Sequence, residues 1–394
     1  HTLPLTLSIT HGPLMLGAHG LRMGLGCAKG QLALPESYRA YLNKTMDTGA
    51  TLPVLKLKLW FAFFNRANVS ATVPTFNLHA QPQQFQLDWL GLTGRSVVSL
   101  DLSELEGDLK ARGLFLKRAN TELTVGALST DYTLHKSLLG LYTGTAHASL
   151  KSLQLITHKQ IQGAIQGLTS SSVIGIQDDL LEGTLKLSLA GATMEGQHYG
   201  PGHLITMVQR VDAVVLTKIR QRMNAIQTLD GLSRQKALLT LLPDLAHLIE
   251  KGAVFSIPTF DLQTPQGLME GSVMLSMPNE KLTSPFQVFS KLKGTGHVHL
   301  TELLLKNMVA DAVRQRLEHM TLLPAVADLS SPSVAPTEKT LEEQIQLLTA
   351  KRMAAFLETG LFVKKGTDFY LDASLEDGRL SVNGKLFSPA MLAF

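Results

Sequence analysis

The sequence contains two nearly identical segments, Val73-Pro-Thr-Phe-Asn-Leu78 and Ile257-Pro-Thr-Phe-Asp-Leu262, which lie 184 positions apart (258 minus 74). Both segments lie in alternating apolar and polar sequence, which is typical of a half-buried β-strand. A repeat of this kind indicates an internal duplication. Because both copies lie in strand-like sequence, they predict a sheet edge or a turn rather than a catalytic loop. The repeat therefore favours a β-rich scaffold that is built twice.

A second pair of similar segments supports the duplication. Gly144-Thr-Ala-His-Ala-Ser-Leu150 resembles Gly294-Thr-Gly-His-Val-His-Leu300, at a separation of 150 residues (294 minus 144). The two pairs occur in the same order along the chain but at different separations. We therefore expect two related halves that have since acquired insertions.

Composition indicates a folded protein and argues against several classes of function. Apolar residues make up 44% of the 394 positions and charged residues 17%, which excludes a disordered chain and leaves enough apolar material for two or three domains. The net charge of +4 is scattered and aromatic residues are only 6%, so we predict no nucleic-acid partner. Cys27 is the single cysteine and cannot form an intramolecular disulfide.

Strand patterns dominate residues 54–155 and predict a broad antiparallel sheet, in which Phe85, Leu87 and Trp89 face one way. Asp377-Gly378 and Asn383-Gly384 predict tight hairpin turns near the end of the chain.

Helices are predicted between these strand regions. The clearest candidate begins at Leu204 and ends at Met223, where apolar residues recur in steps of three and four. Pro243 predicts a kink or two short helices in 233–250. Asp212 follows Val211 in the clearest candidate, and we expect it to stabilise a helix end or to bond to the preceding glycine loop rather than to take part in catalysis. The remaining candidates are 35–46, 303–319 and 340–357.

Together these patterns predict an α+β, β-rich fold with one or more large antiparallel sheets from an internal duplication and amphipathic helices packed on one face. We divide the chain into a mainly-β half at 1–180 and a second α+β half at 181–321. Residues 322–340, rich in proline and serine, predict a linker. Residues 341–394 then form a helix and a β-hairpin that complete the second sheet.

No segment of the chain is long and apolar enough to span a bilayer. The nearest candidate, 52–64, contains Lys56 and Lys58 and is too short. The chain begins at His1 without an initiator methionine, so we expect a signal peptide or a membrane anchor upstream of it. Membrane contact is expected only through such a segment.

A series of landmarks along nearly the whole chain resembles the YdgA-like family of Gram-negative envelope proteins, whose function is unknown. The resemblance implies a periplasmic body behind a signal or an inner-membrane anchor, and it supplies no catalytic residue. The landmarks are His11-Gly-Pro-Leu14, Val73-Pro74, Trp89-Leu-Gly-Leu92, Leu181-Glu-Gly-Thr-Leu185, Gly200-Pro-Gly202 with Val211-Asp212, and Asp377-Gly-Arg-Leu-Ser-Val-Asn-Gly-Lys385.

The chain departs from that family pattern at an aromatic cluster in residues 60–65. We predict that this cluster binds a partner that is specific to this lineage. Its residues are Trp60, Phe61, Phe63 and Phe64.

Candidate chemistry is weak throughout the sequence. His297 and His299 lie on one face of a predicted strand, but a metal site needs three or four ligands and no further ligand lies at a matching spacing. The adjacent acids Asp178-Asp179 and Glu342-Glu343 point apart and are expected to be solvated. Nucleophile-elbow, phosphate-loop and zinc-protease motifs do not occur. We therefore predict no catalytic residue, no cofactor and no metal.

Three functions from different classes stay open. The first is a non-enzymatic assembly protein of the periplasm, such as a subunit of a secretion machine, with other envelope proteins or a second copy as partner. The second is a carrier of lipid or another hydrophobic ligand, which predicts an apolar-lined cavity of several hundred Å³, roughly the usual pocket scale. The third is an unrecognised hydrolase.

Overall fold

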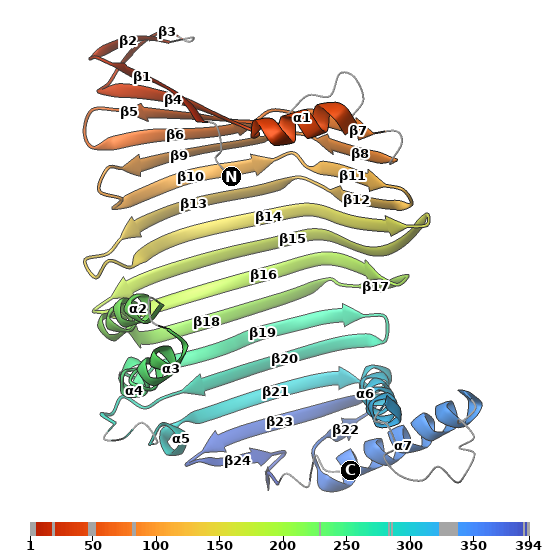
Figure 1. The fold of residues 1–394 in the computed structure, drawn as a ribbon. Coiled ribbons are helices and arrows are strands. Elements are labelled where there is room, and N and C mark those ends of the chain that lie inside the picture. The colour runs from red at the N-terminus through yellow and green to blue at the C-terminus, as the bar shows by residue number, and fades with distance from the viewer. Residues whose placement is uncertain are drawn as a thin grey trace. The chain divides into compact units, whose positions relative to one another are not determined.

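The structure, a computed structural model, describes residues 5–17, 20–45, 53–80, 84–227, 230–282, 284, 287–322, 338–388 and 391 (Figure 1). Strands make up 58% and helices 22%, which confirms the predicted β-rich α+β class. The chain forms two compact units, His1–Asp244 and Leu245–Phe394, called here the N-terminal and C-terminal units. Among the described helices, none has the length and apolarity to cross a membrane.

The N-terminal unit is an antiparallel sheet in which most neighbours in the sheet are also neighbours in the chain. Its pairing order is β1 (Leu5–His11), β4 (Gly26–Ala33), β5 (Val54–Phe61), β6 (Arg66–Val73), β9 (Leu92–Ser99), β10 (Glu104–Ala111), β13 (Leu128–Lys136), β14 (Tyr142–Thr157), β15 (Gln160–Gln177), β16 (Leu180–Met194) and β18 (Gly202–Asp212).

Four short strands extend the sheet sideways, and they pair with one another and with the second part of β14. They are β7 (Phe76–Ala80), β8 (Phe85–Trp89), β11 (Leu114–Arg118) and β12 (Thr121–Val125). The other elements of this unit are the hairpin β2 (Leu14–Gly17) and β3 (Gly20–Met23), strand β17 (Gln197–Tyr199), and helices α1 (Glu36–Thr45), α2 (Ala213–Gln227) and α3 (Gly231–Leu239).

A line of interruptions, which we call the crease, runs across this sheet. Its first part consists of positions 74–75, 90–91, 112–113 and 126–127, which lie between strands. It continues through β14, β15 and β16 at Lys151, Gly167 and Ala190, which are neighbours across the ladder. Gly113 and Gly167 adopt φ values of 123° and 61°. A Cβ at Gly113 would lie 2.4 Å from the Val125 carbonyl oxygen, so glycine is required there.

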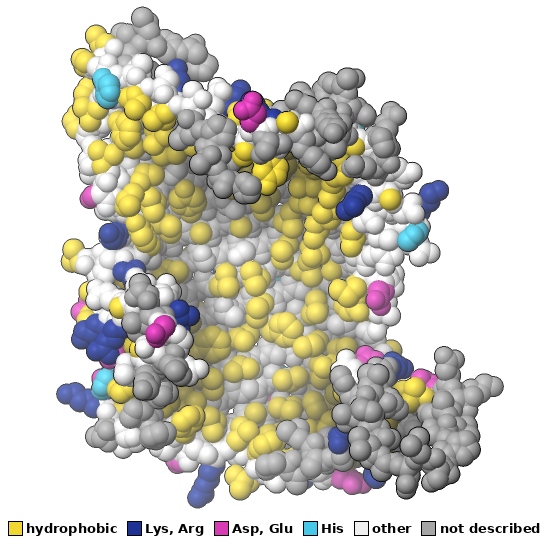
Figure 2. Space-filling view, in the orientation of Figure 1, with side chains coloured by type: hydrophobic (Ala, Val, Ile, Leu, Met, Phe, Trp, Pro, Cys, Tyr) yellow, Lys and Arg dark blue, Asp and Glu magenta, His cyan; other side chains and the backbone are white. Residues whose placement is uncertain are grey.

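The crease shifts the apolar alternation by one residue on every strand that it crosses. Apolar residues on its two sides are three positions apart, as in Val73 and Phe76 or in Leu168 and Ile165. An unbroken strand would place such residues on opposite faces, because side chains alternate with period two. The extra residue at the crease reverses the alternation once, so the apolar side chains on both sides of the crease lie on the same face. Figure 2 shows hydrophobic side chains over both halves of the sheet.

The C-terminal unit has a smaller antiparallel sheet with helices. Its pairing order is β19 (Val254–Thr264), β20 (Gly267–Ser276), β21 (Lys293–Thr301), β23 (Asp368–Glu376), β24 (Arg379–Val382) and β25 (Lys385–Leu386), with β22 (Val363–Lys365) also paired to β23. The helices are α5 (Gln287–Lys291), α6 (Glu302–Leu322) and α7 (Glu338–Thr359), and α4 (Leu242–Ile249) spans the boundary between the units.

The hydrophobic core of the C-terminal unit lies between the sheet and helices α6 and α7. Phe369, Ile345 and Val313 are at most 2% exposed. Each such side chain contributes about 1.5–3 kcal/mol through burial. Arg314 links the two helices by an ion pair with Glu342 at 3.4 Å. The buried cluster contains Leu300, Leu304, Leu305, Val309, Val313, Ile345, Leu361, Phe362, Phe369 and Val382.

The predicted helix from Leu204 to Met223 is wrong in its first half. Residues 202–212 form β18, and α2 begins only at Ala213. A step of four between apolar residues fits period two as well as period 3.6, so Leu204 and Val208 also share one face of a strand. Asp212 begins the helix, because its Oδ1 accepts hydrogen bonds from the backbone N–H groups of Val214 and Val215 at 2.9 and 3.0 Å.

The other predicted helices are confirmed as α1, α3 with α4, α6 and α7. Pro243 lies in the first turn of α4, where its missing N–H is tolerated. Asp377 and Gly378 both have positive φ in the predicted hairpin turn, as do Asn383 and Gly384. Asp178 and Asp179 form the turn between β15 and β16, and both have positive φ.

The two pairs of repeated segments differ in their local structure. The first pair lies where strands are interrupted. Pro74 and Thr75 are part of the crease, and Pro258 and Thr259 form a bulge in β19. The second pair of segments forms regular strands, β14 and β21. Each histidine of that pair lies between an aspartate and a serine of the two neighbouring strands, which are Asp131 and Ser171 for His147, and Asp372 and Ser272 for His297.

The compact units differ from the division drawn from the sequence. Position 180 falls between β15 and β16, which pair along most of their length inside the N-terminal unit. The predicted linker at 322–340 lies largely outside the described residues, since 323–337 are not described. After it, β23 pairs with β21 in the sheet of the C-terminal unit.

Candidate functional site

One face of the N-terminal sheet is apolar over most of its extent (Figure 2). We call it the apolar face and define it by the strand positions that share its register on β5 to β18. Among these positions in the described strands, only Lys136, at the end of β13, and Arg118, at the end of β11, are charged. Typical rows across the face are Leu57, Ala71, Gly94, Leu109 and Thr130, and Leu150, Leu168, Leu189 and Gly202.

The apolar face continues beyond the crease and is partly open to solvent. Phe76 and Trp89 stack there at 6.1 Å between ring centroids. We call the side of the crease that contains β5, β6, β9, β10 and β13 the near side. On this side, Leu168 and Ile174 are 37% and 39% exposed. With strands roughly 4.8 Å apart and a rise of about 3.3 Å per residue, the near side alone covers roughly 1,000 Å². Such a surface is larger than the roughly 300–600 Å² patch of an ordinary monomer and indicates a binding surface.

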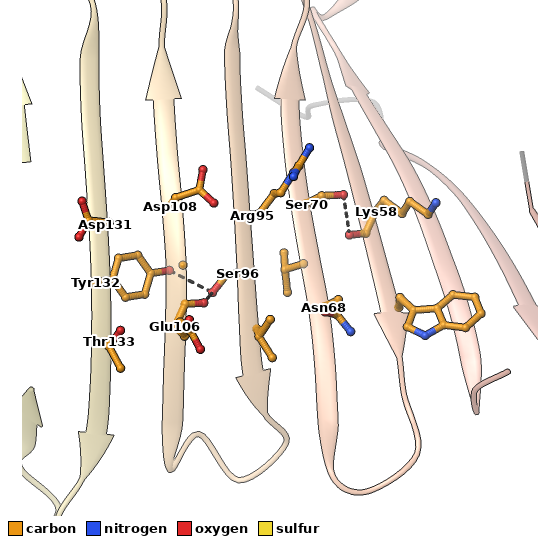
Figure 3. A pocket seen from close by; sticks show the side chains of 14 residues that line it. Lys58, Asn68, Ser70, Arg95, Ser96, Glu106, Asp108, Asp131, Tyr132 and Thr133 are labelled. Carbon is orange, nitrogen blue, oxygen red and sulfur yellow. Dashed lines mark hydrogen bonds between the residues drawn. The ribbon is translucent and has the colours of Figure 1, made fainter. Parts of the chain in front are cut away.

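The opposite face of the same sheet is polar. We call it the polar face, and its positions alternate with those of the apolar face on every strand. A depression of about 900 Å³, which we call the Trp60 pocket, lies on this face over β5, β6, β9, β10 and β13 (Figure 3). Its volume fits the scale predicted for a carrier, but its lining is charged and hydroxylated instead of apolar. Its polar-face lining is Lys58, Trp60, Asn68, Ser70, Arg95, Val97, Glu106, Asp108, Asp131 and Thr133.

The charges of the pocket are segregated by strand. Figure 3 shows Lys58 and Arg95 on one side and Asp108 and Asp131 on the other. Asp108 lies directly opposite Asp131 in the ladder, and Lys58 lies directly opposite Lys29. Like charges in directly opposed positions destabilise a sheet. Arg95 and Asp108 lie directly opposite each other and balance one charge of each sign. The ladder pairs Lys58 with Lys29 and Ser70, so it places no acidic side chain opposite Lys58.

Ion pairs do little to relieve this segregation. Asp108 pairs with Lys110 of its own strand at 3.7 Å. In the part of the chain that the structure describes, Lys58, Arg95 and Asp131 take part in no ion pair.

Hydrogen bonds hold the strands beneath the pocket. Tyr132 lies beside Gly107 of the neighbouring strand, where a Cβ would come within 2.7 Å of the phenol oxygen. The Tyr132 hydroxyl hydrogen-bonds with Ser96 Oγ at 3.0 Å, and Ser96 donates to the Glu106 carbonyl at 3.1 Å. These contacts cross β9, β10 and β13 and keep the register that brings the pocket charges together.

The aromatic cluster predicted as a partner site is divided by strand alternation. Trp60 lies on the polar face and lines the pocket, whereas Phe61 lies on the apolar face opposite Ala67. Phe63 and Phe64 lie in the loop between β5 and β6, where Phe64 is 96% exposed. These four residues do not form one surface. The partner-binding role of each stays a prediction.

The two predicted strand histidines bind carboxylates of neighbouring strands. His297 Nδ1 lies 2.6 Å from Asp372 Oδ1. His299 lies between Glu270 and Asp368, with Nδ1 and Nε2 at 2.9 and 3.1 Å from their oxygens. An imidazole that faces a carboxylate at both nitrogens donates from both, as the imidazolium does.

The pKa of His299 reflects this arrangement. Partial burial lowers the pKa of His299, but the hydrogen bonds with Glu270 and Asp368 outweigh this effect and raise it above its ordinary value of 6.5. The described residues contain no group of three or more histidine, cysteine or acidic side chains that could hold a metal ion.

Sequence reasoning missed the Trp60 pocket and both faces of the N-terminal sheet as sites. The alternation in Leu55-Lys-Leu-Lys-Leu-Trp60 already assigns Lys58 and Trp60 to one face and the leucines to the other. The charges on β9, β10 and β13 could not be joined to Lys58 without the register of the strands.

Comparison with known proteins places the chain in a family. The family described as bacterial protein of unknown function (DUF945) matches residues 1–390, so the chain belongs to that family. No curated protein and no solved structure matches the chain.

Proposed function

We propose that this member of a bacterial family of unknown function is a non-enzymatic carrier that binds the acyl chains of lipids on the apolar face of its N-terminal unit. The observation that carries the proposal is the continuity of that face across β5 to β18 and past the crease, with apolar side chains more than a third exposed. Exposed apolar area of this size is unfavourable in water by roughly 25 cal/mol per Å² until a ligand covers it.

The chemistry of the face favours acyl chains over a folded protein partner. Its side chains are mainly aliphatic or small, and charge is almost excluded from it. Protein interfaces instead concentrate aromatic residues and arginine in a core with a polar rim, and they form many hydrogen bonds. Flexible hydrocarbon chains need only dispersion contacts and exclusion of water.

The proposal includes a periplasmic location, in agreement with the resemblance to YdgA-like envelope proteins. In that compartment the protein would hold lipid between membranes or deliver it to one. The proposal assigns no catalytic residue and no cofactor.

Native mass spectrometry of protein purified without delipidation tests the carrier role. We expect co-purified lipid on the unmodified protein. The matched variants Ile174→Asp and Val173→Asp place a carboxylate on adjacent residues of β15, on the apolar and the polar face respectively. A charge facing hydrocarbon is strongly unfavourable, so Ile174→Asp should retain about tenfold less lipid. Lipid-free unmodified protein, or equal retention in the two variants, would contradict the proposal.

A second candidate, an assembly role in an envelope complex such as a secretion machine, is favoured by Phe64. This ring is 96% exposed in the loop after β5, and its φ is 67°, an unusual backbone conformation for an aromatic residue. Exposed aromatics at fixed positions are typical contact points for a protein partner.

Photo-crosslinking in intact cells tests that second candidate. A crosslinking residue at position 64 should give an adduct of discrete mass, while one at Leu138, which is also fully exposed in a loop, should give none. Adducts of the same pattern from both positions would exclude a specific contact at Phe64.

A further inference from the structure

We propose that the Trp60 pocket binds a short zwitterionic peptide, with the peptide carboxylate toward Lys58 and Arg95 and its ammonium group toward Asp108 and Asp131. The inference does not depend on the carrier function, because the pocket lies on the polar face and acyl chains would occupy the other face.

The charge arrangement points to a ligand with two opposite charges. A simple anion would be attracted by Lys58 and Arg95 but repelled by the adjacent carboxylates, and a simple cation would meet the reverse pattern. A zwitterion neutralises both like-charge groups at once. Charge-assisted hydrogen bonds of this kind are roughly twice as strong as neutral ones. The ligand termini would therefore relieve the two like-charge pairs of the ladder, Asp108 with Asp131 and Lys58 with Lys29.

The spacing of the strands sets the length of the ligand. Lys58, Ser70, Arg95, Asp108 and Asp131 occupy one row across five successive strands. At roughly 4.8 Å between strands, the row spans roughly 19 Å from Lys58 to Asp131. An extended peptide advances about 3.3–3.6 Å per residue, so three to five residues place their termini over the two charged groups.

The remaining lining suits a peptide backbone. Asn68, Ser70 and Thr133 offer amide and hydroxyl groups that can pair with peptide N–H and C=O groups. Trp60, two residues after Lys58 on β5, supplies a flat apolar wall at the cationic end. A nucleic-acid strand is disfavoured, because its phosphates would lie against three acidic side chains of the pocket, Glu106, Asp108 and Asp131.

Isothermal titration calorimetry of the full chain with four forms of tetra-alanine tests the inference. The forms are free, N-acetylated, C-amidated and blocked at both ends. We expect the free peptide to bind, each single block to weaken binding about tenfold, and the doubly blocked peptide to show no binding. Equal affinity for all four forms, or no binding of the free peptide, would overturn the inference.

Two charge-reversal variants assign the termini to the two ends of the pocket. Lys58→Glu should weaken the free peptide about tenfold but leave the C-amidated peptide unaffected, because the latter has lost the same ion pair. Asp131→Lys should likewise weaken binding of the free peptide about tenfold but leave binding of the N-acetylated peptide unaffected. Lys186→Glu is the matched control, since Lys186 lies on the polar face of β16 outside the pocket.

Quenching or shift of Trp60 fluorescence gives a second readout that does not depend on binding heat. It is measured in a Trp89→Phe background, which removes the second of the two tryptophans. Peptide binding without any change in Trp60 emission would place the ligand elsewhere and would also overturn the inference.

Discussion

The two units use the same alternation of apolar and polar residues but cover their apolar faces differently. In the C-terminal unit, α6 and α7 lie on the sheet and enclose a cluster of fully buried side chains around Phe369 and Ile345. The described residues of the N-terminal unit form no comparable buried cluster, and Leu168 and Ile174 on its apolar face stay more than a third exposed. An apolar sheet face thus becomes a core where the chain supplies helices to cover it, and stays partly open to solvent where it does not.

The largest effect is expected from a substitution in the hydrophobic core of the C-terminal unit. Phe369→Ala should cost about 3–5 kcal/mol of unfolding free energy, because Phe369 is 1% exposed and its loss leaves a cavity. Circular dichroism during urea unfolding measures the change. Both tryptophans belong to the N-terminal unit, so tryptophan fluorescence should show an unchanged transition for that unit. Equal shifts in both signals would show that the units do not unfold separately.

A smaller effect is expected at the crease of the N-terminal unit. Gly167→Ala should cost about 1–3 kcal/mol, since φ is 61° and the new Cβ would lie 2.7 Å from the Ala190 Cβ. The same substitution at Gly175, on the same strand with open space around it, should change stability by less than about 0.5 kcal/mol. Urea unfolding followed by tryptophan fluorescence compares them. Similar losses in both variants would mean that the crease has no special backbone requirement.

The smallest effect is a pH dependence confined to the C-terminal unit. The raised pKa of His299 means that its stabilising contribution is fully present below 6.5 and is lost as the pH rises through the folded-state pKa. Stability of this unit should therefore fall on moving from mildly acidic to alkaline pH, and His299→Gln should remove that slope. His147→Gln, on β14 of the N-terminal unit, is the control. An unchanged slope in His299→Gln would exclude the imidazolium bridge between Glu270 and Asp368.

Most elements could be predicted from sequence because their signals are local. Pro243 and the Asp377-Gly378 and Asn383-Gly384 turns each act through their own backbone geometry. The N-terminal half of the predicted helix at 204–223 was wrong because steps of four satisfy both helix and strand periods. Between Val73 and Phe76 a spacing of three did mark the crease, but a single strand cannot show that its neighbours break at the same line.

The sites were less accessible to sequence reasoning because their parts come from distant strands. His299 binds acids that lie 29 and 69 positions away. Lys58 and Asp131 lie on strands separated by β6, β9 and β10, so their common row depends on several registers at once. Trp60 and Phe61 are adjacent in sequence but lie on opposite faces of β5, because side chains alternate along a strand.

The central claim is tested most directly by fluorescence quenching, because the two tryptophans lie on opposite faces of the N-terminal sheet. Trp89 shares its register with the apolar residues Phe76 and Leu114, whereas Trp60 lines the pocket on the polar face. A fatty acid brominated along its acyl chain is titrated into the single-tryptophan variants Trp60→Phe and Trp89→Phe. The account predicts quenching of Trp89 and unaffected emission from Trp60. Quenching of Trp60 alone, or of neither tryptophan, would contradict it.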